Sequence, residues 1–295
     1  MPLDQAENLR RLVEQKKGNF SRILKHTICI TSGKGGVGKS NIALNLGIVL
    51  SKLNKKVLLF DGDISLANLN ILLGVSPDYN IYNLIKGDKN INDVIFQTQY
   101  KGLDLLPGSS GIKEITNLMD YEIDRLKSQL QLLEDKYDYI IVDTAAGISN
   151  IVMGFVLSSD MVLLVVTPET TSITDAYALL KISVNEKRDI NVKIIMNMVD
   201  SKKHGKEAFN KFNLLSKKFL NKELELYGII EKEKKVSEAV IIQTPIIEYA
   251  PNSSFAYAIK NIANLIVKGI KPQEEKDSSF VEKFLEKMKN FNIYK

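Results

Sequence analysis

Residues 27–47 read TICITSGKGGVGKSNIALNLG. An apolar run typical of a buried strand leads into a glycine-rich loop, and the residues after the loop keep helical spacing. Gly33, Gly38, Lys39 and Ser40 match the pattern G-x-x-x-x-G-K-[ST] in this strand–loop–helix context. Such loops bind phosphate, because glycines let backbone N–H groups approach the anion and the helix amino end favours negative charge. We therefore predict a nucleotide site in which Lys39 reaches the β- and γ-phosphates and Ser40 binds Mg²⁺.

Beyond this loop, short apolar runs alternate with helical patterns over residues 25–270. The runs are rich in Val, Ile and Leu with little polar alternation, as in strands that are covered on both faces. They predict strands at 27–31, 56–60, 103–106, 139–142, 161–166, 192–196 and 226–230. The alternation predicts an α/β fold, with a doubly wound, mostly parallel sheet and helices on both faces, as in P-loop NTPases.

The composition excludes several classes of protein. The longest uninterrupted apolar run is about six residues, at 161–166, whereas a membrane-spanning helix needs roughly 20. The first residues, MPLDQAENLRRL, lack the apolar core of an export signal, so we expect a cytoplasmic protein. The single cysteine, Cys29, excludes a disulfide within the chain. A formal charge of +5 over 295 residues does not by itself indicate a nucleic-acid partner.

The two ends differ from the central domain at 25–270. Residues 1–24 are polar and charged, which fits a solvated leader or a short helix. Residues 271–295 hold a polar linker and then an amphipathic helix whose apolar side carries Phe280, Phe284, Leu285, Met288 and Phe291. This pattern fits either a helix packed onto the domain or an interfacial membrane anchor. The position after a polar linker favours the anchor.

Lys34 follows the first glycine of the loop, where a phosphate cradle built by one subunit does not need it. The stretch KGGVGKS resembles the deviant Walker A loop of the MinD/ParA family, and the resemblance covers nearly the whole chain. In that family the first lysine crosses a dimer interface to the partner's nucleotide. The resemblance therefore implies a homodimer formed with ATP, Mg²⁺-dependent hydrolysis to ADP, and a return to monomers.

Two carboxylate motifs are also similar to this family. DGDISLANLN, after the strand at 56–60, resembles switch I, and YDYIIVDTAAG resembles a Walker B strand followed by switch II. The resemblance implies that Asp61 and Asp143 hold Mg²⁺ and that Asp63 orients the attacking water. Thr144 and Gly147 would sense the γ-phosphate. Alternatively, the aspartates after the strand at 56–60 cap the next helix.

The implied catalytic set is Lys34, Lys39, Asp63 and Asp143. The implied ATP contacts are Gly33, Lys34, Gly35, Gly36, Val37, Gly38, Lys39, Ser40, Asn41 and Asn197. Asn197 follows a predicted strand at the position where the family reads adenine, although an asparagine there can also simply begin a loop. Glu231 and Glu233 replace the family's Pro-x-Asp element, which puts base contacts there in doubt. No Asn-Lys-x-Asp guanine motif occurs in the sequence, so ATP is the expected nucleotide.

Four stretches resemble the FlhG branch of the family, whose members govern flagellar number and placement: DQAENLRRL, SLANLN, PETTSITDAYALLK and YAPNSSFAYAI. The resemblance implies that residues 1–24 stimulate an SRP-type GTPase of the FlhF kind, and that flagellar basal-body proteins are possible partners. It also implies that residues 271–295 attach the ATP-bound dimer reversibly to an anionic membrane surface. The implied partner motif is Asp4, Gln5, Ala6, Leu9 and Arg10.

Other members of the family remain alternatives. A ParA- or MinD-type ATPase that positions DNA or the division site shares the same core. The sequence shows no dense basic stripe, so no specific nucleic acid is expected as a partner. Iron–sulfur relatives use cysteines that this chain lacks. A scaffold with a decayed site is disfavoured, because every catalytic motif residue is present.

Overall fold

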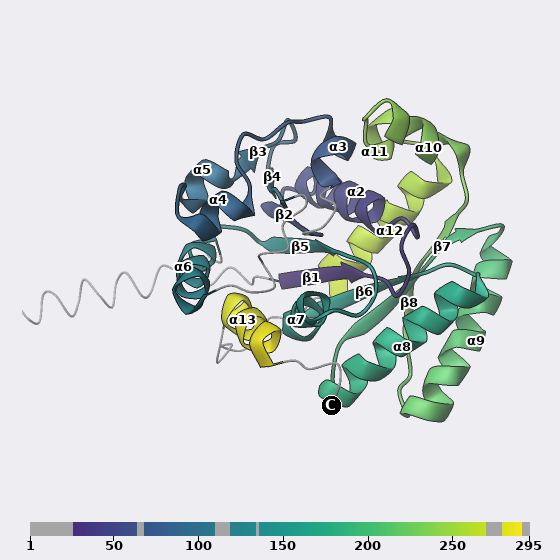
Figure 1. Ribbon diagram of the computed structural model, residues 1–295. Coiled ribbons are helices and arrows are strands. Elements are labelled where there is room, and N and C mark those ends of the chain that lie inside the picture. Colours follow the sequence, from purple (N-terminus) through teal and green to yellow (C-terminus); the bar gives the residue numbers. More distant parts are fainter. Residues whose placement is uncertain (1–25, 64–67, 110–118, 134–135, 270–278, 291–295) are drawn as a thin grey trace, which may run out of the picture.

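The computed structural model describes residues 26–63, 68–109, 119–133, 136–269 and 279–290, and an eight-stranded sheet crosses it (Figure 1). The strand order is β3-β4-β2-β5-β1-β6-β7-β8, and every neighbouring pair is parallel except β3–β4. The strands are β1 (His26–Thr31), β2 (Val57–Gly62), β3 (Phe96–Gln97), β4 (Leu103–Leu106), β5 (Tyr139–Thr144), β6 (Met161–Val166), β7 (Val192–Val199) and β8 (Glu225–Glu231).

All seven predicted strands are present, and the predicted doubly wound α/β fold is confirmed. Strand β5 extends beyond its predicted end to include Asp143 and Thr144, and β2 likewise includes Asp61 and Gly62. The polar residues at these strand ends therefore belong to the sheet itself. Only the two-residue edge strand β3 was not predicted.

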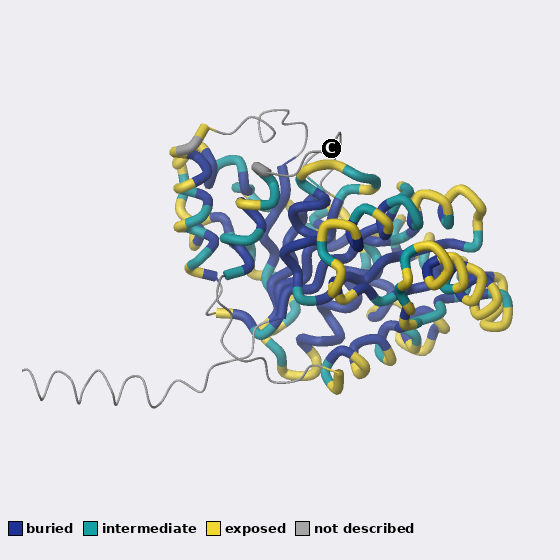
Figure 2. Tube along the Cα trace, turned by 90° about the horizontal axis from the view of Figure 1, so that it is seen from below, coloured by how far each residue is buried: buried dark blue, intermediate teal, exposed yellow. Residues whose placement is uncertain are grey.

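Helices cover both faces of the sheet, and each face has its own apolar core. One face carries α4 (Ile81–Lys86), α5 (Ile91–Val94), α6 (Asp120–Gln131), α7 (Asn150–Ser158), α8 (Thr170–Glu186), α9 (Lys202–Leu220) and α13 (Phe280–Asn290). The other carries α2 (Lys39–Lys52), α3 (Leu69–Leu73), α10 (Lys234–Ile241), α11 (Ile246–Tyr249) and α12 (Ser254–Gly269). Figure 2 shows the buried strands in the middle, with exposed residues confined mainly to the outer sides of the helices.

The C-terminal helix α13 lies against α7 (Figure 1), which is the packed-helix alternative. Phe280, Phe284 and Leu285, expected on a membrane-facing side, are buried in the domain core, and Met288 packs against that core. In this conformation the apolar side is covered by the domain, and its predicted role in membrane binding stays a prediction. An eleven-residue helix is too short to be stable alone in water, so its apolar side is covered by α7 instead. Phe291 lies outside the described residues.

Residues 1–24, with the predicted partner motif, lie outside the described part of the chain. The two histidines have different environments. The His204 side chain is 43% exposed, but His26 is buried as the first residue of β1, with its ring 6.0 Å from that of Tyr139. In the ranges that the structure covers, no helix is both long and apolar enough to cross a membrane.

Candidate functional site

The phosphate loop connects β1 to α2, near the carboxyl ends of β2 and β5. Gly36 and Gly38 have φ angles of 77° and 92°, which residues with a side chain rarely adopt. Gly33 is needed for another reason. A Cβ there would lie 2.2 Å from the carbonyl carbon of Asp175 in α8, so only glycine lets the loop pass this helix. The predicted strand–loop–helix arrangement is therefore present, held between α2 and α8.

Lys39 is buried at the start of α2 and points toward carboxylates. Burial lowers the pKa of its ammonium group, while the negative charges of Asp143 and Asp63 oppose that shift. The three side chains thus form one electrostatic group, although they come from three separate parts of the sequence. A buried lysine that is only partly neutralised by its neighbours is suited to attract phosphate oxygens.

Asp143 and Asp61 are directly paired in the register of β5 and β2. Asp143 is 1% exposed and accepts a hydrogen bond from the Ser40 side chain, while its Oδ1 atom has no partner among the described residues. Burial raises the pKa of Asp143 to about 7, against the opposing effects of Ser40 and Lys39. A buried carboxylate oxygen of this kind requires a partner. Asp143 and Ser40 thus provide an oxygen pair of the type that Mg²⁺ prefers.

The donor set also fits magnesium better than a metal held by protein ligands alone. The described residues contain no group of three or more His, Cys, Asp or Glu side chains placed to hold a metal. Magnesium in nucleotide enzymes commonly uses one or two protein oxygens, with phosphate oxygens and water completing the shell. Asp143 and Ser40 would hold the ion, which would supply charge neutralisation at the β- and γ-phosphates.

Asp61 is surrounded differently. It is 2% exposed and accepts backbone N–H groups from Asp63, Asn68 and Leu69 at 3.2, 3.1 and 3.2 Å. Burial and the charge of Asp143 raise its pKa to about 7, against the lowering effect of hydrogen bonds from Leu69 and Asp63. Leu69 begins α3. The helix-capping alternative therefore applies to Asp61, whereas the charge of Asp63 acts on Lys39 and opposes the lowering of its pKa.

The segment after β5 contacts the base of the phosphate loop. Gly147, with φ 87°, donates its backbone N–H to the carbonyl of Ser32 at 2.9 Å. The Thr144 hydroxyl lies 3.2 Å from the carbonyl oxygen of Ile30 in β1. Both proposed γ-phosphate sensors thus touch the strand and loop that would hold the nucleotide. Residues 145–149 connect this segment to the beginning of α7.

Lys34 does not join this carboxylate group. Its Nζ atom lies 2.6 Å from Glu169 Oε2 and 3.0 Å from Thr171 Oγ1, at the beginning of α8. The hydrogen bond and charge of Lys34 lower the pKa of Glu169, which keeps the ion pair charged. The Lys34 side chain is 38% exposed. It is partly exposed and paired with Glu169.

A second cavity adjoins the loop at the end of β7. It has a volume of about 470 Å³ and is lined by Gly38, Asn41, Asn197, Met198, Asp200, Glu231, Lys232, Glu233, Lys234, Val236, Ser237 and Phe255. Asn197 donates its side-chain amide to the carbonyl of Val37 at 2.7 Å. Glu233 accepts hydrogen bonds from the Ser254 hydroxyl and the Phe255 backbone. The cavity therefore has the position and size for a base, with Asn197 tied to the phosphate loop and Glu233 to α12.

Sequence reasoning missed three residues of this site. Glu169 and Thr171 stand in PETTSITDAYALLK, a stretch used only for its resemblance, and nothing in their spacing from Lys34 indicates the contact. Met198 lines the base cavity with φ 56°, a conformation unusual for a large side chain. Its neighbour Asn197 is the local signal, because it is a buried polar residue inside strand β7 rather than the start of a loop.

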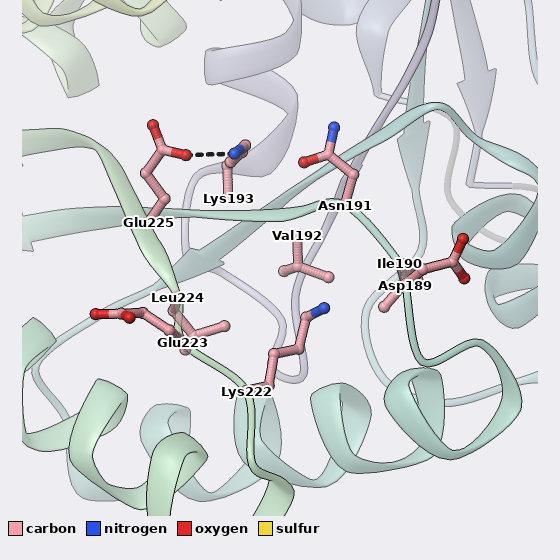
Figure 3. Close-up of a pocket in the computed structure, with 9 residues that line it drawn as sticks. All are labelled: Asp189, Ile190, Asn191, Val192, Lys193, Lys222, Glu223, Leu224 and Glu225. Atoms are coloured by element: carbon pink, nitrogen blue, oxygen red, sulfur yellow. Dashed lines mark hydrogen bonds and ion pairs between the residues drawn. The ribbon is translucent and has the colours of Figure 1, made fainter.

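Another polar pocket lies at the opposite end of β7 and β8 (Figure 3). It contains none of the predicted site residues. Its two lysines already have partners: Lys193 pairs with Glu225, as Figure 3 shows, and Lys222 donates to the carbonyl of Arg188 at 3.3 Å. Because the amino ends of parallel strands point away from the phosphate loop, this pocket is separate from the nucleotide site.

Comparison with known proteins identifies the family of the chain. The model of the AAA domain family matches residues 25–196. The antiactivator FleN of Pseudomonas aeruginosa is 35% identical over 239 residues, which is 81% of this chain and 85% of FleN. The flagellum site-determining protein YlxH of Helicobacter pylori is 38% identical over 242 residues, 81% of each chain.

Solved structures show the same relationship. MinD from Pyrococcus horikoshii, complexed with Mg-ADP, superposes with a TM-score of 0.68 at 26% identity, covering 83% of this chain and 96% of that one. A chain of the MinC:MinD complex from Aquifex aeolicus gives 0.69 at 29% identity, covering 85% and 98%. With the phosphate loop, its second lysine and the strand-end aspartates in place, the chain belongs to the MinD/ParA family of deviant Walker A ATPases, alongside FleN, FlhG and YlxH, and is an ATP hydrolase.

Proposed function

We propose that this ATPase is a switch between a monomer and an ATP-bound dimer that associates reversibly with the membrane and regulates flagellar number and placement. Its similarity to FleN and to the flagellum site-determining protein YlxH supports the flagellar role. The observation that carries the switch is the packing of α13 on α7, the helix that follows the proposed switch II.

Aromatic stacking holds α13 in place. The ring of Phe284 lies 4.1 Å from that of Phe155 with an interplanar angle of 10°, and Phe280 stacks on the same ring at 6.5 Å. Gly154 makes this approach possible, since a Cβ there would lie 3.2 Å from ring atoms of Phe284. At the polar side, Glu282 pairs with Lys127 of α6 at 3.1 Å. The apolar side of α13 can thus be buried either in this groove or in a bilayer, but not in both.

The same helix α7 links the groove to the nucleotide. It begins one residue after its N-cap Ser149, and residues 145–149 connect it to the strand that ends in Asp143 and Thr144. Gly147, in this connection, is hydrogen-bonded to the phosphate loop. In the proposed cycle, ATP rearranges this connection, α7 shifts, and α13 leaves its groove. Two released helices in one dimer then double the valency for lipid.

Dimerisation in this proposal depends on Lys34. ATP would bring two phosphate loops face to face, and each Lys34 would exchange its contact with Glu169 for the partner's phosphates. The partial exposure of Lys34 and its separation from Lys39 support this role. Within the subunit, Lys39 stabilises developing phosphate charge, Asp143 and Ser40 would hold Mg²⁺, and Asp63 orients water for in-line attack.

The sharpest test of the switch is Gly154→Leu. The added side chain occupies the groove against Phe284 but leaves the apolar side of α13 unchanged, and leucine favours helix α7 more than glycine does. We expect this variant to sediment with anionic vesicles without ATP, whereas the unaltered protein needs ATP. Glu286→Ala, on the exposed side of α13, is the matched control and should behave like the unaltered protein.

Two results would count against the proposal. One is a Gly154→Leu variant whose vesicle binding remains as dependent on ATP as that of the unaltered protein. The other is lipid binding that survives deletion of residues 278–295, which would assign α13 to domain packing alone.

The proposed partner is tested separately, by measuring GTP hydrolysis by an FlhF-type GTPase with and without this protein. Residues 1–24 should be required for any stimulation of GTP hydrolysis, and Arg10→Ala should reduce that stimulation.

A further inference from the structure

Asp61 occupies a position that a metal ligand does not need. Both of its carboxylate oxygens are already used: Oδ1 accepts the backbone N–H of Asp63, and Oδ2 accepts those of Asn68 and Leu69. The side chain is almost completely buried. A carboxylate that accepts three backbone N–H groups organises the chain around it.

These three contacts define the two ends of one loop. Asp63 stands at the beginning of the segment between β2 and α3, and Asn68 and Leu69 stand at its end. In the described part of the chain, α3 receives no cap from the side chain of its own N-cap residue, Asn68. Asp61 supplies that cap from the neighbouring strand. One carboxylate therefore fixes both the start of the loop that carries Asp63 and the helix that follows it.

The loop after β4 closes the remaining side of Asp61. A Cβ at Gly108 would lie 2.7 Å from the backbone oxygen of Asp61 and 3.1 Å from its carboxylate carbon. Glycine at 108 therefore allows the β4 end to pack directly on Asp61. This wall restricts the carboxylate to the hydrogen bonds it already makes.

Asp143 provides the contrast, because it stands beside Asp61 in the sheet and has one oxygen without a partner in the described ranges. We propose that Asp61 is a positioning residue that fixes both ends of the loop carrying Asp63, and that it is not a ligand of Mg²⁺. The inference rests on the Mg²⁺-dependent hydrolysis proposed above, but concerns the role of Asp61 alone. Asp143 and Ser40 remain the residues that would hold the ion.

Asp61→Asn is the first variant to test. The asparagine keeps one carbonyl oxygen, but its amide nitrogen cannot accept the N–H groups that the lost oxygen bound. We expect kcat to fall roughly tenfold to hundredfold, because a catalytic group displaced by an ångström loses about that much. The Mg²⁺ concentration for half-maximal binding of a fluorescent ATP analogue should stay unchanged. Hydrogen exchange at residues 68–69 should become roughly fivefold faster, as for loss of a helix cap.

Gly108→Ala gives an independent test, since it introduces no group that can bind or lose a metal. Its methyl group pushes on Asp61, so it should reproduce the lower kcat and the faster exchange at 68–69, again with unchanged Mg²⁺ dependence. Asp143→Asn is the reference for a metal-holding residue. It should raise the half-saturating Mg²⁺ concentration without changing exchange at 68–69.

The outcomes separate the two roles. If Asp61→Asn raises the half-saturating Mg²⁺ concentration as Asp143→Asn does, while exchange at 68–69 stays slow, Asp61 is a metal-holding residue and the inference is wrong. If neither Asp61→Asn nor Gly108→Ala changes kcat, Asp61 does not position Asp63. If Mg²⁺ has no effect on nucleotide binding even in the unaltered protein, the proposed magnesium site fails, but the exchange measurements still report the loop.

Discussion

Two lysines in one phosphate loop have separate environments. Lys39 is buried among Asp63 and Asp143, whereas Lys34 is tied to Glu169 and Thr171 at the start of α8. Glu169 is thus paired with the ammonium group of Lys34, the same group that would bind the partner's phosphates in the proposed dimer. The exchange of one anionic partner for another keeps Lys34 charge-paired in both states, so neither state leaves a desolvated charge without a partner.

Lys34→Ala should therefore abolish ATP-dependent dimerisation while leaving the fold intact. The lysine is partly exposed and its ion pair with Glu169 contributes at most about 1 kcal/mol to folding. Light scattering with ATP and with ADP measures the effect. Lys52→Ala is the matched control, because Lys52 is also exposed and paired, with Glu248 at 2.5 Å. A Lys34→Ala variant that still dimerises with ATP would remove Lys34 from the interface.

The buried carboxylates predict how stability depends on pH. The folded-state pKa values of Asp61 and Asp143 are both about 7, raised mainly by burial, whereas an unfolded aspartate has a pKa of about 3.9. The folded state therefore holds more protons between these values. Their contribution to stability is fully present below about pH 4 and is lost as the pH rises through about 7.

We therefore expect the thermal unfolding midpoint of the nucleotide-free protein to fall as the pH rises from about 4 to about 7. Asp143→Asn removes one of the two titrating groups and should flatten the dependence, with the largest gain in stability over the unaltered protein at the alkaline end. Calorimetry in buffers of matched ionic strength measures the midpoints. An equally steep decline in the variant would mean that Asp143 is not the titrating group.

At this scale the sequence predicts the identity of site residues better than their contacts. The loop pattern gives Lys39 and Ser40, and the polar ends of buried strands give Asp61 and Asp143. The partners of Lys34 lie 135 and 137 residues away. The hydrogen bonds of Asp61 depend on how the chain returns to it after the loop. Neither the contacts of Lys34 nor the hydrogen bonds of Asp61 follow from a local sequence pattern, because only the packing of the sheet and helices brings these groups together.

The packing of α8 on the phosphate loop connects two elements that are far apart in sequence. Gly33 lies against the backbone of Asp175 and Ala176, in the second turn of α8. The first turn of the same helix carries Thr171, and its N-cap is Glu169. The helix therefore sets both the path of the loop and the position of Lys34.

Gly33→Ala should displace the loop from α8, since its Cβ would lie 2.2–2.5 Å from backbone atoms that cannot rotate away. We expect a loss of roughly 1–3 kcal/mol in the free energy of unfolding, as for other overpacked sites, together with weaker ATP binding. Denaturant unfolding and nucleotide titration measure the two effects. Gly35→Ala is the matched control for the unfolding measurement, because the described structure places nothing within 4 Å of a Cβ there. Equal behaviour of the two variants would contradict the steric argument.

Elements differ in how well the sequence predicts them. Parallel strands buried on both faces are largely apolar runs, so β6 has its predicted bounds, and so does β4 although it includes Asp104. Strand β3 is only two residues long and antiparallel, which is too short for any periodic signal. The amphipathic pattern of α13 was predicted, but its partner was not. An apolar side indicates that a surface will cover it, and Gly154 and Phe155 of α7 supply that surface only after folding.

At the scale of the molecule, one surface bears on the comparison with DNA-segregating relatives. Six exposed lysines lie along α9: Lys202, Lys203, Lys206, Lys211, Lys217 and Lys218. Lys217 is paired with Glu223 at 2.5 Å, and the expectation of no dense basic stripe stays a prediction. Leu214 and Phe219 stand among these lysines, with exposures of 66% and 61%. Exposed apolar side chains of this size are typical of a protein or lipid contact rather than of a duplex backbone.

We accordingly expect no ATP-dependent retention of duplex DNA near physiological salt, and only weak, salt-sensitive binding at low ionic strength. Filter binding across a salt series, with ATP and with ADP, measures this. The double change Lys211→Glu and Lys218→Glu should remove the low-salt binding and leave ATP hydrolysis unaltered. Tight binding that requires ATP and is lost in this variant would favour a DNA-positioning function instead.

The groove on α7 binds a helix of the same chain, α13, so this contact is intramolecular. A helix joined to its groove by a short linker is present there at an effective concentration in the millimolar range. In the proposed switch, lipid must compete with this intramolecular occupant. Membrane recruitment then has a threshold that is set jointly by the linker length, the fit of Phe284 on Phe155, and the density of anionic lipid. If the proposed switch operates, lengthening the segment at 270–278 should lower the density of anionic lipid needed for recruitment, without any change to the nucleotide site.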